Sequence, residues 1–422
     1  SPVSGQVIKG ALGFSPNTPA NGYLQYNEIN DKFVVTSDPS FLTGKGYAIR
    51  AESGTNGYNK VYNFTGTPNN GNIQYQSLRF TDAAHGFNLV GNPYPSNIDF
   101  NKLHAMNSSN IYSTAWFWTN NSYTAGQVGS GYSGNNYAMF NGTGGSPATS
   151  NPSNPFNNSM TPDGKIKVGQ AFIVQAKASA PLDFNNGIRV TDNGGFFQKT
   201  EAKSRFWLTL TSPNTLVNTI LIGYVSGATD GYETDFDGEL FAIGSDSFYS
   251  ILGARKLAIQ GKADRFSVED KITLGNVYSQ NGNYKIALKD PEGLFYGNQM
   301  VYLKDKLLKK TIKLNDGNDY TFQAVKGTDI NRFEIVYKED EFLTSDSVSN
   351  SAFEVYRDGS DYVVTSSRVL DTIEVYDTSG RLLISQKTTS KSVRIAISDL
   401  ANGVYIIKAE NSGDVKTKKI IK

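Results

Sequence analysis

Residues 372–408 read TIEVYDTSGRLLISQKTTSKSVRIAISDLANGVYIIK, and this stretch decides the fold that we expect. Short apolar runs alternate with turns in which Gly follows Asp, Asn or Ser, a pattern typical of tight β-hairpins. Over 352–422 the pattern gives seven β-runs, at 353–356, 362–365, 372–376, 381–385, 393–397, 404–408 and 415–421. Seven short strands at this spacing predict a small immunoglobulin-like sandwich.

Three motifs follow one another in this stretch: VYDTSGRL at 375–382, LANGVYII at 400–407 and KKIIK at 418–422. With them the tail resembles the type A C-terminal sorting domain of cargo proteins of the type IX secretion system of Bacteroidota. By this resemblance the residues of the sorting signal are Gly380, Arg381, Gly403, Tyr405, Lys419 and Lys422.

The resemblance also implies a route and partners. The domain is expected to be an export signal that the outer-membrane translocon and a cargo-shuttling outer-membrane barrel protein recognise. A sortase-like peptidase is then expected to remove it, with cleavage between Glu341 and Ser351. The product would have crossed the periplasm and outer membrane, to be secreted or held at the cell surface, often on lipopolysaccharide.

Composition narrows the class of protein further. The 422 residues include 40 Lys plus Arg against 39 Asp plus Glu, so no basic field is present and we expect no nucleic-acid partner. No apolar run is long enough to cross a bilayer, so we do not expect an integral membrane protein. The absence of Cys excludes disulfides, thiolate catalysis and Cys-based zinc sites. Because the chain has neither an initiating Met nor a signal peptide, we expect it to be part of a longer precursor.

Upstream of the tail we expect two more all-β regions. Residues 1–197 are rich in Gly, Asn and Tyr, with strand candidates at 32–36, 46–51, 73–80, 115–119 and 170–176, and with 123–158 as a long surface loop. Residues 203–338 carry regular strand runs separated by polar turns, which predict a larger, jelly-roll-like sandwich. Residues 339–351 are charged and Ser-rich and are expected to be a linker. The predicted fold is therefore all-β and multidomain, built of β-sandwiches.

Motifs for catalysis are nearly absent. The chain has only two histidines, His85 and His104, and neither Gly-x-Ser-x-Gly nor His-Glu-x-x-His occurs. Residues 129–134 fit G-x-G-x-x-G, but no strand precedes them and no helix follows, so we interpret them as a loop. We therefore expect surface or capping histidines and no enzyme in this chain.

Five acidic residues crowd one turn-rich segment: Asp230, Glu233, Asp235, Asp237 and Glu239. Carboxylates are the hard oxygen ligands that Ca²⁺ prefers, so the first four are a candidate calcium site, although their order does not match an EF-hand. The alternative is a solvated acidic loop between two strands. No other cofactor is expected.

Aromatic residues gather around 115–119. In a strand Trp116 and Trp118 share one face, and with Tyr112 and Tyr123 nearby they could form a platform that stacks on a glycan or binds another protein. The alternative is that the Trp pair fills a core.

Two functions stay open for the exported portion. It is either an adhesin or binding module, or an accessory C-terminal region of a larger secreted hydrolase whose catalytic domain lies upstream of residue 1.

Overall fold

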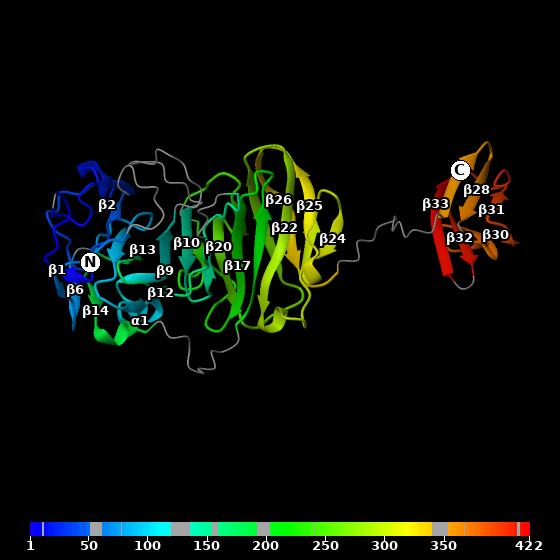
Figure 1. Cartoon of the computed structure of the whole chain (residues 1–422). Coiled ribbons are helices and arrows are strands. Elements are labelled where there is room, and N and C mark those ends of the chain that lie inside the picture. The colour runs from blue at the N-terminus through cyan, green and yellow to red at the C-terminus, as the bar shows by residue number, and fades with distance from the viewer. Residues whose placement is uncertain are drawn as a thin grey trace. The chain divides into compact units, whose positions relative to one another are not determined.

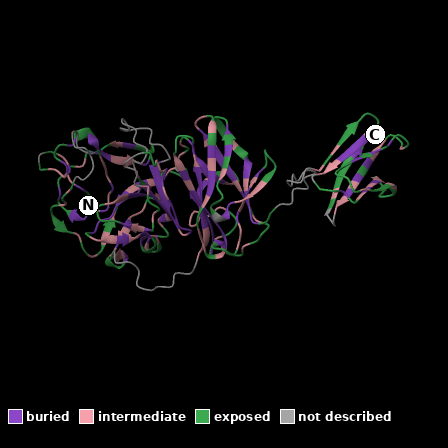
Figure 2. Cartoon of the chain, turned by 45° about the vertical axis from the view of Figure 1, so that its right-hand side comes forward, coloured by how far each residue is buried: buried purple, intermediate pink, exposed green. Residues whose placement is uncertain are grey.

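The structure, a computed structural model, describes residues 1–10, 12–50, 61–76, 78–119, 136–153, 159–191, 203–240, 242–339, 353–366, 368–411 and 414–422. The chain forms two compact units, Ser1–Asp340 and Glu341–Lys422 (Figure 1). Almost all regular structure is strand, which confirms the predicted all-β class. In both units the buried residues follow the strands (Figure 2). None of the helices in the described part is long and apolar enough to cross a membrane.

The first part of the larger unit is built on a five-stranded antiparallel sheet. Its order is β11 (Gly145–Ser146), β10 (Tyr137–Phe140), β9 (Ile111–Trp118), β13 (Ala171–Ala176) and β7 (Phe87–Gly91). On β9 the side chains alternate, so that Ala115 and Phe117 enter one core and Trp116 enters another. Two-sided burial of this kind is typical of a central sheet.

Shorter elements surround this sheet. The small sheets are β1 (Val3–Ser4) with β5 (Thr67–Pro68), β3 (Lys32–Val35) with β2 (Tyr23–Asn27) and β4 (Ala48–Ile49), β12 (Lys165–Ile166) with β8 (Asn97–Asp99) and β15 (Arg189–Val190), and β14 (Leu182–Phe184) with β6 (Ile73–Tyr75). Helix α1 (Phe100–Met106) begins where the Asp99 carboxylate accepts a hydrogen bond from the Lys102 backbone N–H, an N-cap that stabilises the first turn.

The prediction of a surface loop at 123–158 is wrong for residues 136–153, the part of this segment that the structure describes. Residues 136–153 carry β10 and β11, and the four β10 residues are all buried. The run of Tyr137, Ala138, Met139 and Phe140 is apolar on both faces, because β10 lies between two cores. This short strand was not predicted because the residues on both sides of it are mostly Gly, Asn and Ser, which are typical of loops.

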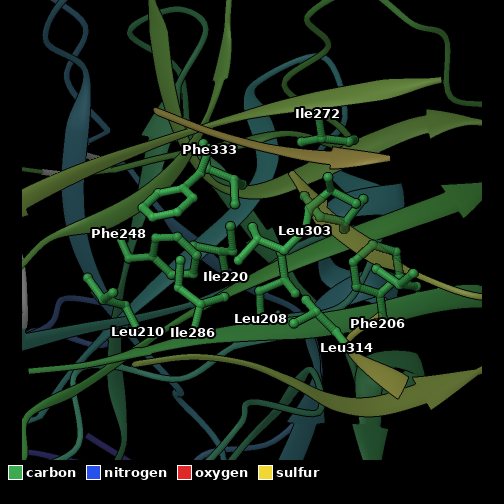
Figure 3. Packing of buried hydrophobic residues seen from close by; sticks show 14 of the residues in the cluster. Phe206, Leu208, Leu210, Ile220, Phe248, Ile272, Ile286, Leu303, Leu314 and Phe333 are labelled. Atoms are coloured by element: carbon green, nitrogen blue, oxygen red, sulfur yellow. The ribbon is translucent and has the colours of Figure 1, made fainter. Parts of the chain in front are cut away.

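The second part of the larger unit is one long sheet that folds over a core. Its order is β24 (Lys310–Lys313), β23 (Tyr302–Asp305), β26 (Gly327–Val336), β21 (Lys271–Tyr278), β19 (Phe248–Leu252), β20 (Arg255–Ala263), β17 (Val217–Val225), β16 (Ser204–Thr211), β22 (Gly282–Glu292) and β25 (Tyr320–Ala324), with β18 (Gly238–Glu239) beside β20. Within the described strands, β17 and β20 make the one parallel pair. Side chains from both halves of this strand order, such as Phe206 of β16 and Phe333 of β26, lie in a single core (Figure 3).

The two parts of the larger unit share a third apolar cluster. Trp116 and Met139 of the five-stranded sheet pack there with Trp207, Leu221 and Ile259 of the long sheet. The Trp207 indole N–H also donates to the Gly145 carbonyl oxygen at 2.8 Å. The long sheet therefore packs one of its faces on the core shown in Figure 3. Its other face packs on the five-stranded sheet.

The smaller unit is a seven-stranded antiparallel sandwich, as predicted. One sheet has the order β27 (Phe353–Asp358), β28 (Asp361–Ser366) and β31 (Ser392–Ile395); the other has β30 (Leu382–Lys387), β29 (Thr372–Asp377), β32 (Val404–Asn411) and β33 (Asp414–Ile421). Its own core includes Val364, Ile373, Val375 and Ile407. The fourth strand, β30, joins the second sheet, whereas in a constant-type immunoglobulin domain it lies in the first.

Candidate functional site

The turn between β29 and β30 is organised by Asp377. Its Oδ1 accepts hydrogen bonds from the backbone N–H groups of Ser379 and Arg381 at 2.9 and 3.0 Å, and its Oδ2 lies 3.1 Å from Arg381 Nε. The hydrogen bond from the Ser379 hydroxyl, with those of the backbone N–H groups and the nearby Arg381, holds the pKa of Asp377 below its usual range. Gly380 has φ +81°, and the space where a Cβ would stand is open. Gly is therefore needed here for backbone conformation and not for lack of room.

Tyr405 closes the corner that leads into β32. Its ring is buried in the core of the smaller unit, and its hydroxyl donates to the Ala401 carbonyl oxygen at 2.6 Å. A tyrosine near the start of the sixth strand that bonds to the backbone a few residues upstream is the tyrosine corner of immunoglobulin-like sandwiches. Tyr405 of the LANGVYII motif thus has a structural role in this fold.

The last motif fastens β33 to the same corner. The backbones of Gly403 and Lys422 exchange two hydrogen bonds, with N···O distances of 3.2 and 2.9 Å. The Lys422 ammonium donates to the carbonyl oxygens of Ser398, at 2.6 Å, and Leu400. Lys422 therefore stabilises the loop between β31 and β32 through these hydrogen bonds.

The strand register brings the three motifs to one end of one sheet. Asp377 lies opposite Tyr405, and Tyr405 lies opposite Ile420. Lys419 lies opposite Ile406 and is exposed. The residues that the sequence predicted as a signal are thus adjacent in space. The run Asp-Thr-Ser-Gly at 377–380 predicts a tight turn in which Asp bonds to its own backbone and Gly takes a positive φ, and the structure confirms both features.

The acidic segment 230–239 does not converge on one point. Asp230 lies 3.0 Å from the Lys262 ammonium, Glu233 accepts from the Thr229 backbone N–H, and Glu239 pairs with Arg255. Among the residues that the structure describes, no three Asp, Glu or His side chains are placed to hold a metal ion. The four predicted calcium ligands are therefore not brought together here.

Two acidic residues in this segment have structural partners. Asp237 is buried and accepts hydrogen bonds from the backbone N–H groups of Glu233 and Gly261. Burial raises the pKa of Asp237 to about 6, although these two hydrogen bonds oppose the shift. The Asp235 carbonyl oxygen accepts from the Ser113 hydroxyl at 2.8 Å, which joins the segment to β9.

The two tryptophans of the predicted aromatic platform differ in burial. Trp116 is buried in the cluster between the two sheets, edge-on to Phe87, while Trp118 at the end of β9 is 44% exposed. Tyr123 lies outside the described residues. Trp116 therefore acts as packing.

Both histidines have acidic neighbours. His85 Nδ1 lies 2.7 Å from Asp82 Oδ1, which also accepts from two backbone N–H groups of the same turn. His104, on α1, is half-buried with its Nε2 3.9 Å from Asp235 Oδ1, and burial lowers its pKa. Neither forms a triad with a Ser and an Asp among the contacts of the described residues.

Comparison with known families agrees with the geometry of the tail. Residues 359–422 match the family model described as the secretion system C-terminal sorting domain. The chain is therefore an exported cargo protein of the type IX secretion system, bound for the cell surface or the extracellular space, and its tail interacts with the secretion machinery. Residues 1–337 match the model of a domain of unknown function, DUF8693, and the chain belongs to that family. No curated protein and no solved structure matches the chain.

Proposed function

We propose that the seven-stranded sandwich is the export signal recognised by the outer-membrane translocon and its shuttle barrel, and that residues 1–337 are the passenger. The observation that supports this most is the convergence of the three motifs at one end of a sheet, in a unit with a core of its own. A signal held by a folded domain can be recognised whatever passenger precedes it. The route then runs through the periplasm and across the outer membrane.

The passenger is proposed to be a non-enzymatic binding module of adhesin type. The interactions described above for Asp237, His85 and His104 are contacts within the fold and do not form a catalytic arrangement. Long antiparallel sheets with loops at their ends favour recognition, because such loops vary while the scaffold stays rigid. Glycans or another surface are the proposed ligands.

Processing completes the proposal. A sortase-like peptidase is proposed to cut within 341–351, a segment that lies outside the described residues and precedes β27 in the sequence. Mass spectrometry of the surface form tests this step, since an intact Lys422 in most molecules argues against cleavage.

A reporter fusion tests the export signal. We place residues 353–422 behind a fluorescent protein in a bacterium with this secretion system. The fusion should reach the surface or the medium, while the same reporter followed by residues 1–337 should stay in the periplasm. If the first fusion stays in the periplasm, the proposed signal is wrong.

A second experiment tests the adhesin role. An in-frame deletion of residues 1–337 that leaves the tail intact should reduce attachment of cells to polysaccharide-coated surfaces. If attachment is unchanged on a panel of glycans and host proteins, the adhesin proposal fails.

A further inference from the structure

The outer face of the four-stranded sheet carries apolar side chains that the core does not use. Residues directly opposite in antiparallel strands point to the same side of the sheet. Across the strands, Leu382 lies opposite Tyr376, Tyr376 opposite Ile406, and Ile406 opposite Lys419. In the next outward-facing row Val404 lies opposite Ile421. We call this set the Ile406 face: Tyr376, Leu382, Val404, Ile406, Lys419 and Ile421.

These side chains are open to solvent. Leu382 is 46% exposed, Ile406 is 40% exposed and Ile421 is 64% exposed. The inward-facing neighbours Val375 and Ile407 are fully buried, so the alternation along β29 and β32 gives apolar residues on both faces near this end. An antiparallel sheet with one solvated face ordinarily places polar residues outside. A contiguous apolar patch on such a face is typical of an interaction site.

Apart from Val415 at the far end of β33, the next rows of the same face are mainly polar. In the row that follows, Glu374 lies opposite Lys408, with their charged groups 2.9 Å apart, and the Tyr376 hydroxyl donates to Glu374. On the other sheet of the sandwich, Arg394 contacts Asp358 and Asp361. The apolar residues therefore gather at the end where the three motifs meet.

Charge identifies the kind of partner. The motif segments 375–382, 400–407 and 418–422 contain four basic residues, Arg381, Lys418, Lys419 and Lys422, and one acidic residue, Asp377. Asp377 pairs with Arg381 in its own turn, so the surplus positive charge of these segments comes from Lys418, Lys419 and Lys422. A second copy of the chain would bring like charges together, whereas a partner protein with surface carboxylates would match them.

We propose that the Ile406 face is the surface through which the sorting domain docks on a protein of the export machinery that presents apolar side chains bordered by carboxylates. The inference rests on the proposed export function and specifies its contact. Ile406 and Leu382 are buried on docking, and Lys419 faces an acidic group of the partner.

The test compares variants of the full chain in a bacterium with this secretion system. Ile406→Glu places a carboxylate in the centre of the face, and the exported fraction should fall about tenfold or more, because a buried charge without a partner is costly. Lys419→Glu reverses the charge at the border, leaves the apolar residues in place and should lower export about fivefold. Equal export of both variants and the wild type overturns the proposal.

Val415→Glu is the matched control. Val415 lies on β33, faces the same side as Ile421 and is 47% exposed, but it lies at the other end of the strand. Its export should stay within about twofold of the wild type, since an exposed charge costs little. If Val415→Glu blocks export as strongly as Ile406→Glu, the contact is not localised and the proposal fails. Thermal melts of the purified chains check that all variants stay folded, and Lys419→Glu decides the outcome if Ile406→Glu does not.

Other occupants of the face have their own readouts. A wild-type dimer in sedimentation that Ile406→Glu dissociates would assign the face to a second copy, and flotation with lipopolysaccharide vesicles that Ile406→Glu abolishes would assign it to lipid. Either result overturns the proposal. Deletion of 353–422 distinguishes the proposed export function from the proposed docking face. If the deleted chain is still exported, the export function is contradicted. If deletion stops export but Ile406→Glu is exported fully, only the docking face is contradicted.

Discussion

At the scale of single residues, the buried pair of Asp305 and Arg332 is expected to contribute strongly to stability. Asp305 is fully buried, Arg332 Nη2 lies 2.8 Å from its Oδ2, and the guanidinium stands over the rings of Phe322 and Phe333. Asp305→Asn leaves the arginine buried without a counter-charge and should lower the free energy of unfolding by about 3 kcal/mol or more. Urea denaturation of the purified chain measures this difference.

The control for this prediction is an exposed pair. Lys285 and Asp319 also lie in the larger unit, with their charged groups 2.6 Å apart, but both side chains are open to solvent. Asp319→Asn should therefore change stability by about 1 kcal/mol or less. Comparable losses for the two variants would mean that burial does not decide the strength of these pairs.

Asp237 predicts a pH dependence. Its pKa is raised to about 6 by burial, above the ordinary value of 3.8, so the folded state binds its proton more tightly than the unfolded state does. The stability that protonated Asp237 gives to the folded state is complete below about pH 4. It is lost as the pH rises through 6, and the free energy of unfolding falls by about 3 kcal/mol over that window. Asp237→Asn cannot ionise. The stability of the wild type relative to this variant should fall between pH 4 and 7, and parallel pH profiles in denaturant titrations would contradict the assignment.

At the scale of elements, the tyrosine corner should stabilise the sorting domain. Tyr405→Phe keeps the ring and removes the hydroxyl that bonds to Ala401, so unfolding of the smaller unit should become easier by about 1 kcal/mol. Tyr356→Phe is the control, because Tyr356 is half exposed on β27. Differential scanning calorimetry of the full chain measures both. A Tyr405→Phe chain that melts like the Tyr356→Phe chain would show that the corner bond adds nothing.

Elements of the tail could be predicted because each carries its own local signal. In β29 the alternation of Ile373 and Val375 defines an inner face, and the Asp377 turn fixes the hairpin. Strand β10 has no such signal, since it is buried on both faces and its neighbours are Gly and Asn. Its pairing with β9 supplies the stability that its own sequence does not show.

The candidate sites could not be predicted fully either, because the sequence does not specify where each side chain points. Asp230 and Asp237 are close in sequence, yet one reaches Lys262 and the other accepts backbone N–H groups. Trp116 and Trp118 are two residues apart on β9, but only Trp116 lies beneath the neighbouring sheet. Which side chain is covered depends on tertiary packing, and spacing alone does not specify it.

At the scale of the whole molecule, the two parts of the larger unit are expected to unfold together. Their sheets share the cluster of Trp116, Met139, Trp207, Leu221 and Ile259, together with hydrogen bonds between the parts. A single family model also covers 1–337. Apolar contact on this scale couples stability across an interface, whereas the smaller unit has a core of its own.

Calorimetry of the full chain should therefore give two transitions, one for each unit. Trp207→Ala removes one of the two tryptophans of the shared cluster and its bond to Gly145, so the larger unit should lose about 3–5 kcal/mol of stability while the transition of the smaller unit stays in place. Val364→Ala, in the core of the smaller unit, should shift only the second transition. Three transitions in the wild type, or a Trp207→Ala effect confined to residues 203–337 in hydrogen exchange, would show that the shared cluster does not join the two sheets into one cooperative unit.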